Sequence, residues 1–100
     1  MAGVIYPEYE GKPVIPDHKR GVLSELEEEG LDLDDVVSIL ETGFDCSSSK
    51  RDRAILERCI QRKTRIIKVV VEEAEEYWAL RHVGSFKLSR KELRKRRRQP

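Results

Sequence analysis

The residues best suited to chemistry in this sequence are basic, and they gather toward its carboxyl end. Positions 87–100 hold eight Lys or Arg against one acid, Glu92, and nine more basic residues lie between 50 and 86. Such side chains bind phosphate through charge and hydrogen bonds, so they predict nucleic-acid contacts. The residues predicted to make these contacts are Arg58, Arg62, Lys63, Arg65, Arg90, Lys91, Arg94, Lys95, Arg96, Arg97 and Arg98.

The acidic residues gather at the opposite end. Residues 1–49 contain three basic and twelve acidic side chains, a net charge of −9, whereas residues 87–100 carry +7. The stretch ELEEEGLDLDD could therefore bind a basic partner, including the chain's own basic end, through salt-sensitive contacts. A solvated helix face and a solubilising tail are the plainer interpretations of these two charge runs, and both stay open.

The sequence gives little support for a metal-binding site. The only His and Cys residues are His18, Cys46, Cys59 and His82, and their separations of 28, 13 and 23 residues match no zinc-binding pattern. We therefore predict no metal and no cofactor. The opening MAGVIYPEYEGK lacks the features of a secretory leader, and no apolar run is long enough to span a bilayer. We predict a cytoplasmic protein with reduced thiols.

Two helices are predicted in the first half. The first follows Asp17, a suitable N-cap, and ends at Gly30, which suits a left-handed C-terminal position. The second follows Asp32 and ends at Gly43. The apolar positions repeat at helical spacing, and the connection is so short that the helices should be neighbours. The predicted apolar face of the pair consists of Val22, Leu26, Val36, Val37 and Leu40.

Strand-forming residues dominate the second half. β-Branched and aromatic side chains predict strands near 54–61, 64–72 and 77–84, with turns near Arg62–Lys63 and Glu73–Glu76. Their short connections favour antiparallel pairing. Three prolines make residues 1–16 an expected irregular arm, and Ser89 with Glu92 matches a helix capping box.

These elements predict one α+β domain over residues 17–86, with the arm at 1–16 before it and a basic C-terminal helix or tail at 87–100. Two N-terminal helices should pack on one face of a three- to four-stranded antiparallel sheet, with residues 44–47 as the optional fourth strand.

The stretch DHKRGVLSELEEEGLDLDDVVSIL resembles the opening of the DUF4258 and BrnT-like small proteins. The features that carry the resemblance are His18 at the start of a helix, Gly30 with Leu31 at its end, and Asp35 with Val36 in the next helix. As a layout it covers roughly residues 17–86. Where the group tends to have an Arg four residues after the His, this chain has Val22. The resemblance implies a RelE-like fold and, for many members, ribonuclease toxins paired with an antitoxin.

RNA cleavage would need a base, an acid and positive charge beside the phosphate. The candidate catalytic residues are His18, Lys68, Arg81 and His82. Because neighbours along a strand point to opposite faces, Arg81 and His82 are not expected to share one site. The solvated face of a half-covered sheet would contain the same residue types. Tyr77, Trp78 and Phe86 could stack on bases, or pack in the core.

The leading prediction is an RNA-directed, toxin-like protein, either a ribonuclease or an RNA-binding protein of the RelE-like class. Its expected partners are RNA, including RNA on the ribosome, and an antitoxin or other acidic protein. No membrane and no small-molecule cofactor are expected. The alternative is a non-enzymatic protein-interaction module that uses the basic tail and the acidic helices.

Overall fold

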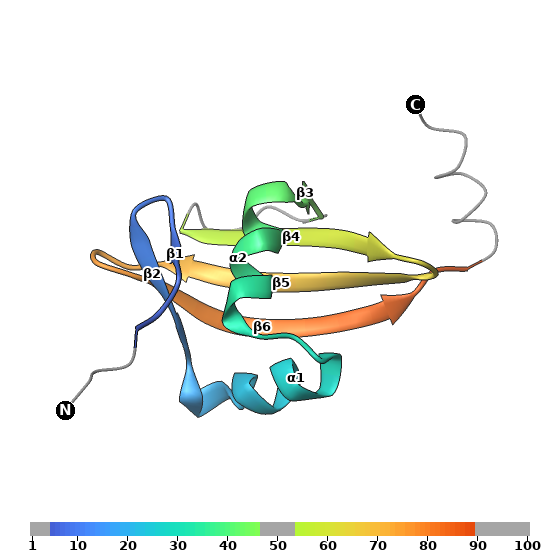
Figure 1. Cartoon of the computed structure of the whole chain (residues 1–100), viewed down its shortest axis with the longest axis horizontal. Coiled ribbons are helices and arrows are strands. Elements are labelled where there is room, and N and C mark those ends of the chain that lie inside the picture. Colours follow the sequence, from blue (N-terminus) through green and yellow to red (C-terminus); the bar gives the residue numbers. More distant parts are fainter. Residues whose placement is uncertain (1–4, 47–53, 90–100) are drawn as a thin grey trace.

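The computed structural model describes residues 5–46 and 54–89. Six strands and two α-helices make up this part of the chain (Figure 1). In chain order they are β1 (Glu8–Tyr9), β2 (Lys12–Pro16), the 3-10 helix η1 (His18–Arg20), α1 (Val22–Glu29), α2 (Leu33–Thr42), β3 (Phe44–Asp45), β4 (Ile55–Arg62), β5 (Arg65–Glu73) and β6 (Trp78–Lys87).

The predicted fold class is wrong. The strands form one mixed, curled sheet in the order β1-β2-β6-β5-β4-β3, rather than a three- to four-stranded antiparallel sheet of RelE-like type. β4, β5 and β6 pair antiparallel, as expected, but β2 runs parallel to β6, with Val14 opposite Trp78. The extra strands come from residues 8–16, where an irregular arm was expected.

The prolines that argued against strands in this segment lie where the ladder needs no donor. Pro13 precedes the first β2–β6 pair, at Val14, and Pro16 lies beyond the end of the short β1. Val14 donates its N–H to the Pro7 carbonyl and Asp17 donates its N–H to the Leu80 carbonyl. A strand can hold proline at such positions without losing a hydrogen bond.

Local capping chemistry sets the helix ends. Asp32 caps α2, and Asp32 and Asp35 form a reciprocal capping box with N···O distances of 2.9 and 2.8 Å. Gly30 ends α1 in the left-handed region, as predicted. The first helix begins later than expected. Asp17 caps only the short η1, and Gly21, with φ of 68°, separates η1 from α1.

The main core lies between the sheet and the two helices. All five residues of the predicted apolar face are buried there, together with side chains from one face of β5 and β6. We call this side of the sheet the helix face and the opposite side the second face. α1 packs against β6, whereas α2 packs against β4, β5 and β1, so the helices cover different strands (Figure 1). Within the described residues, no helix is long and apolar enough to cross a membrane.

Candidate functional site

A charged cleft of about 300 Å³ opens on the second face of the sheet. Three of the four predicted catalytic residues, Lys68, Arg81 and His82, line it. Arg20 enters from η1, and Glu57 from β4. His18, the fourth candidate, is exposed on η1 and does not line the cleft. The structure therefore brings together residues from η1, β4, β5 and β6.

A β-bulge places Arg81 and His82 in the same cleft, contrary to the expectation from strand alternation. His82 lies opposite Val70, while Leu80 lies opposite the next residue, Val71, so Arg81 has no partner on β5. An extra residue of this kind changes the direction in which side chains point. Strand periodicity alone could not reveal it, although Gly84, two residues after His82, is the kind of strand glycine that often accompanies a bulge.

Arg81 connects two elements through its guanidinium. It donates to Asp17, the η1 cap, and its Nη2 lies 2.7 Å from Glu72 Oε1 on β5. Desolvation of Arg81 works against its charge, but the bonds to Asp17 and Glu72 outweigh it and raise the Arg81 pKa. Desolvation likewise opposes ionisation of Asp17, yet the Lys19 N–H and Arg81 hold the Asp17 pKa below its usual value.

His82 also has an acidic partner. Its Nδ1 lies 2.9 Å from Glu25 Oε2 on α1, and the other oxygen of Glu25 accepts the Val83 N–H at 3.0 Å. The Glu25 carboxylate thus satisfies a backbone donor on the β6 edge beyond β2, and a covered edge is protected from pairing with another chain. The Ser85 hydroxyl donates to Glu29, one helical turn further along α1.

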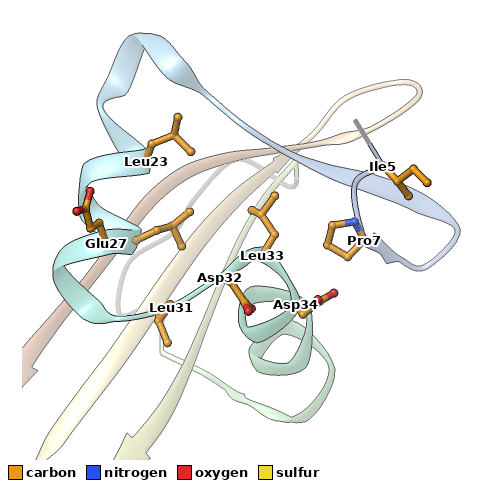
Figure 2. Close-up of a pocket in the computed structure, with 9 residues that line it drawn as sticks. Ile5, Pro7, Leu23, Glu27, Leu31, Asp32, Leu33 and Asp34 are labelled. Carbon is orange, nitrogen blue, oxygen red and sulfur yellow. The ribbon is translucent and has the colours of Figure 1, made fainter. Parts of the chain in front are cut away.

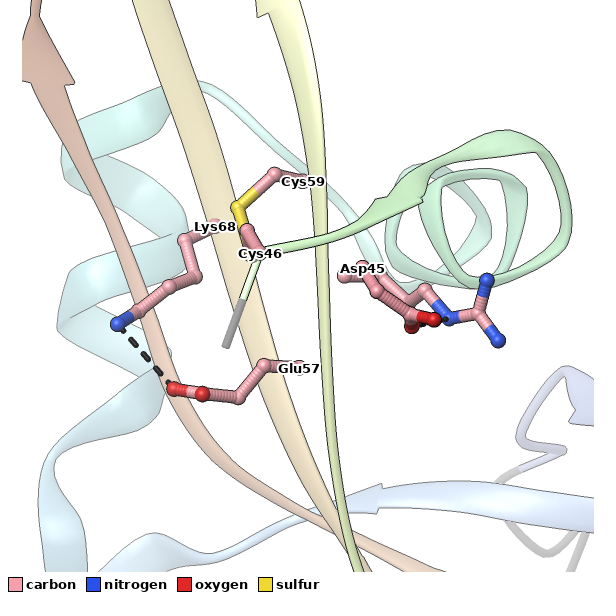
Figure 3. The surroundings of a disulfide bond; sticks show 6 residues. Asp45, Cys46, Glu57, Cys59 and Lys68 are labelled. Atoms are coloured by element: carbon pink, nitrogen blue, oxygen red, sulfur yellow. Dashed lines mark ion pairs between the residues drawn. A yellow bond between two sulfur atoms is a disulfide. The ribbon is translucent and has the colours of Figure 1, made fainter. Parts of the chain in front are cut away.

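Glu57 is the buried acid of the cleft, with only 4% of its surface exposed. Lys68 Nζ lies 3.2 Å from its Oε1. The disulfide Cys46–Cys59 lies beside this pair and joins the residue after β3 to β4 (Figure 3). The expectation of reduced thiols is therefore wrong for this structure. Across residues 5–46 and 54–89, no group of three or more His, Cys, Asp or Glu is arranged to hold a metal.

The pairing in the cleft limits what it can do chemically. Lys68, Arg81 and His82 each have a carboxylate within 3.2 Å. A general base or acid must exchange its proton with a substrate, and a phosphate-binding cation must be able to turn toward it. In this arrangement the charged groups instead connect η1, α1 and the strands to one another.

A second basic region lies at the far end of β4, β5 and β6, at the β4–β5 hairpin. Arg62 lies opposite Arg65, and Arg65 lies opposite Lys87, so three cations form one row across three strands. Lys63 occupies the hairpin turn, and all four side chains are exposed. We call these four residues the cationic end.

The cationic end has no direct ion pair among the residues that the structure describes, and Arg65 is linked to Glu29 only through the Ser85 hydroxyl, which donates to that carboxylate. Arg65 Nη2 donates to the Ser85 hydroxyl at 2.6 Å, and none of the four residues takes part in an ion pair. Arg58, also predicted to bind nucleic acid, differs, because its Nε lies 3.3 Å from Asp45 Oδ1. The predicted contacts Arg90, Lys91, Arg94, Lys95, Arg96, Arg97 and Arg98 lie outside the described residues.

One exposed aromatic ring lies at the same end of the sheet as the cationic end, but its side chain is on the second face, whereas Arg65 and Lys87 are on the helix face. Phe86, which is 49% exposed, follows Ser85 on β6 and lies opposite Ile66. Trp78, by contrast, is buried, and its Nε1 donates to the Tyr9 carbonyl at 3.0 Å. Tyr77 is partly exposed but lies at the start of β6, away from the hairpin. Of the three aromatic residues considered for stacking, only Phe86 is exposed at this end of the sheet, on the face opposite the row of cations.

Comparisons with models of known protein families, with curated proteins and with solved structures give no match to this chain. The resemblance of residues 17–86 to the toxin-like group therefore stays a prediction.

Proposed function

We propose that this protein binds single-stranded RNA at its cationic end and does not cleave it in the charged cleft. The row Arg62–Arg65–Lys87 carries the proposal. Like charges directly opposite each other destabilise a sheet, so this row costs stability in the free protein. An RNA backbone laid across the three strands would turn that repulsion into attraction and release the counterions held by its phosphates.

Phe86 supports a single-stranded rather than a double-stranded ligand. The ring and the row lie on opposite faces at one end of the sheet, so a flexible single strand held by the cations can turn round this end and stack an unpaired base on Phe86, which a stiff duplex cannot do. The chain also leaves the sheet at this point. Leu88 is buried, and its N–H donates to the Thr64 carbonyl of the hairpin at 2.7 Å. In the sequence, RKELRKRRR follows directly after Ser89 and lies outside the described residues.

The choice of binding over cleavage follows from the carboxylate partners of Lys68, Arg81 and His82. Each would have to leave its carboxylate partner before it could act on a phosphodiester. The choice of RNA over DNA rests on the resemblance of residues 17–86 to the toxin-like group, and the experiment below compares the two.

The test uses a fluorescein-labelled 12-nucleotide RNA and full-length protein carrying Arg62→Gln, Lys63→Gln and Lys87→Gln together. Each lost phosphate contact should lower the slope of log affinity against log salt by about 1, so the triple variant should lose about 2–3 units. Anisotropy titrations at several salt concentrations give the slope. The labelled RNA should remain intact in gels after prolonged incubation with wild-type protein.

Lys12→Gln is the matched control, because Lys12 lies near Glu73 at the opposite end of the sheet. It should leave the salt slope unchanged. A loss in Lys12→Gln of one third or more of that in the triple variant would show that net charge alone governs binding, because the control removes one charge and the triple variant three, and it would overturn the proposed site. A DNA strand of the same sequence that binds as tightly would remove the RNA preference. RNA cleavage that disappears in Arg81→Met would restore the ribonuclease prediction.

A further inference from the structure

An apolar groove separates α1 from α2 on the side of the molecule that faces the N-terminal segment. Its volume is about 780 Å³, and it is open to solvent. Leu26 and Leu31 are its buried lining residues. Leu23, Leu33 and Ile5 also line it (Figure 2). Leu23 is 49% and Ile5 93% exposed. Exposed aliphatic side chains gathered around one depression are typical of an interaction site.

The groove exists because the two helices pack on different strands. α1 packs against β6, where Glu25 accepts from the Val83 N–H and Glu29 from the Ser85 hydroxyl. α2 instead packs over β4 and β5. The short connection at Gly30 joins them at one end only, so the apolar residues between them are incompletely covered. The expected close helical hairpin would have left no such space.

The rim of the groove is acidic. Glu27, Asp32 and Asp34 line it, and among the described residues that line it there is no Lys, Arg or His (Figure 2). Asp32 uses one oxygen in the α2 capping box. Within the part of the chain that the structure describes, none of the three carboxylates has an ion-pair partner. A ligand with apolar groups at its centre and cations at its edges would therefore complement the groove.

These features select one kind of occupant. A small molecule would remain half in water in a groove this open, whereas a helix can lay an apolar stripe along it. A second copy of this chain, docked symmetrically, would place the acidic rims against each other. Basic residues on the partner would instead pair with the rim and guide the encounter.

We propose that this groove docks a basic, amphipathic helical segment of a partner protein. Two or three aliphatic side chains of that segment enter between Leu23 and Leu33, and its Lys or Arg residues pair with Glu27 and Asp34. The groove and the cationic end are separate surfaces, so this interaction does not depend on RNA binding.

The probe is a labelled 14-residue peptide with Leu at positions i, i+3, i+4 and i+7 and Lys elsewhere. A matched peptide has every Leu replaced by Gln. The Leu peptide should bind full-length protein at least about tenfold more tightly than the Gln peptide, because removing an anchor residue commonly costs more than 1 kcal/mol. Leu23→Ser and Glu27→Lys, both at exposed positions, should each weaken it by about tenfold.

Glu76→Lys is the control. Glu76 is exposed in the β5–β6 turn, so this substitution makes the same charge change as Glu27→Lys but away from the groove. It should alter the peptide affinity less than about twofold. Equal binding of the two peptides, or an equal effect of Glu27→Lys and Glu76→Lys, would overturn the proposal. A tenfold gain in peptide affinity on deletion of residues 90–100 would also overturn it, because the chain's own end would then be the occupant. A dimer that Leu23→Ser dissociates in sedimentation would assign the groove to a second copy.

Discussion

The charged cleft and the cationic end lie on the same three strands, but their cations differ in whether a carboxylate lies beside them. In the cleft, Lys68, Arg81 and His82 each face a carboxylate. At the cationic end, Arg62, Arg65 and Lys87 share one row, and none has an ion-pair partner within residues 5–46 and 54–89. Charges neutralised within the chain hold elements together, whereas a row of like charges lowers stability and is available to an external anion.

The largest expected effect tests the core that supports both regions. Leu40 is buried on α2, so Leu40→Ala should lower the free energy of unfolding by about 2–5 kcal/mol through lost burial and a cavity. Urea denaturation measures the loss. RNA affinity should stay near the wild-type value where the variant is still folded. A loss well under 1 kcal/mol would contradict the assignment of α2 to the core.

The disulfide gives the next effect, on the side of the cleft. Cys46 and Cys59 are separated by 13 residues, and closing a loop of this length stabilises a fold by about 3 kcal/mol in the chain-entropy treatment. Reduction by a dithiol should lower the melting temperature, while RNA affinity at the cationic end stays unchanged. An unchanged melting temperature after mass spectrometry confirms two free thiols would contradict the prediction.

Replacing Arg81 separates structural from ligand-binding charge. Arg81→Met removes contacts to both Asp17 and Glu72, so the melting temperature should fall by several degrees, at about 4–8 °C for each kcal/mol lost. RNA affinity should remain within about twofold of wild type. Arg20→Met is the control, because Arg20 is mostly exposed and lies 3.5 Å from Asp17. If Arg81→Met loses as much RNA affinity as the triple variant of the cationic end, the cleft belongs to the RNA site.

The lowered pKa of Asp17 predicts how the same network depends on pH. A carboxyl with a lowered folded-state pKa contributes stability above its unfolded pKa of about 3.9, and loses it as pH falls through the folded value. Asp17→Asn should therefore have a lower free energy of unfolding than wild type near neutral pH. The gap between the two free energies should close in acid below about pH 4. Denaturation at a series of pH values checks this. A gap that persists unchanged to pH 2.5 would contradict it.

The smallest effect has opposite signs for stability and binding. Arg62→Glu places an acid opposite Arg65, so it should stabilise the sheet by about 0.2–1 kcal/mol while weakening RNA binding. Lys63→Glu is the comparison. Lys63 lies in the turn and faces no cation across the ladder, so it should lose RNA affinity without gaining stability. If Arg62→Glu also fails to gain stability, the repulsion between the cations of the row is weaker than their pairing across the strands predicts.

Features that depend on neighbouring residues were predictable from the sequence. Asp32 and Gly30 set helix ends through their own side-chain and backbone chemistry, and the three long strands lie within a few residues of the predicted ranges. The basic character of the hairpin was likewise evident in Arg62, Lys63 and Arg65. Each of these signals needs only a few consecutive residues, because capping and strand alternation act over short distances.

Tertiary structure alone decided which distant residues meet. Nothing near Val14 indicates that it pairs parallel to Trp78, and strand alternation places Arg81 and His82 on opposite faces, whereas the bulge brings them to one cleft. Cys46 and Cys59 were visible in the sequence, but only folding brings β3 beside β4 and joins them. The acids that neutralise the cleft come from η1, α1, β4 and β5. Which acid pairs with which cation depends on the order and register of the strands. The conformational preferences of short sequence segments do not determine either of these.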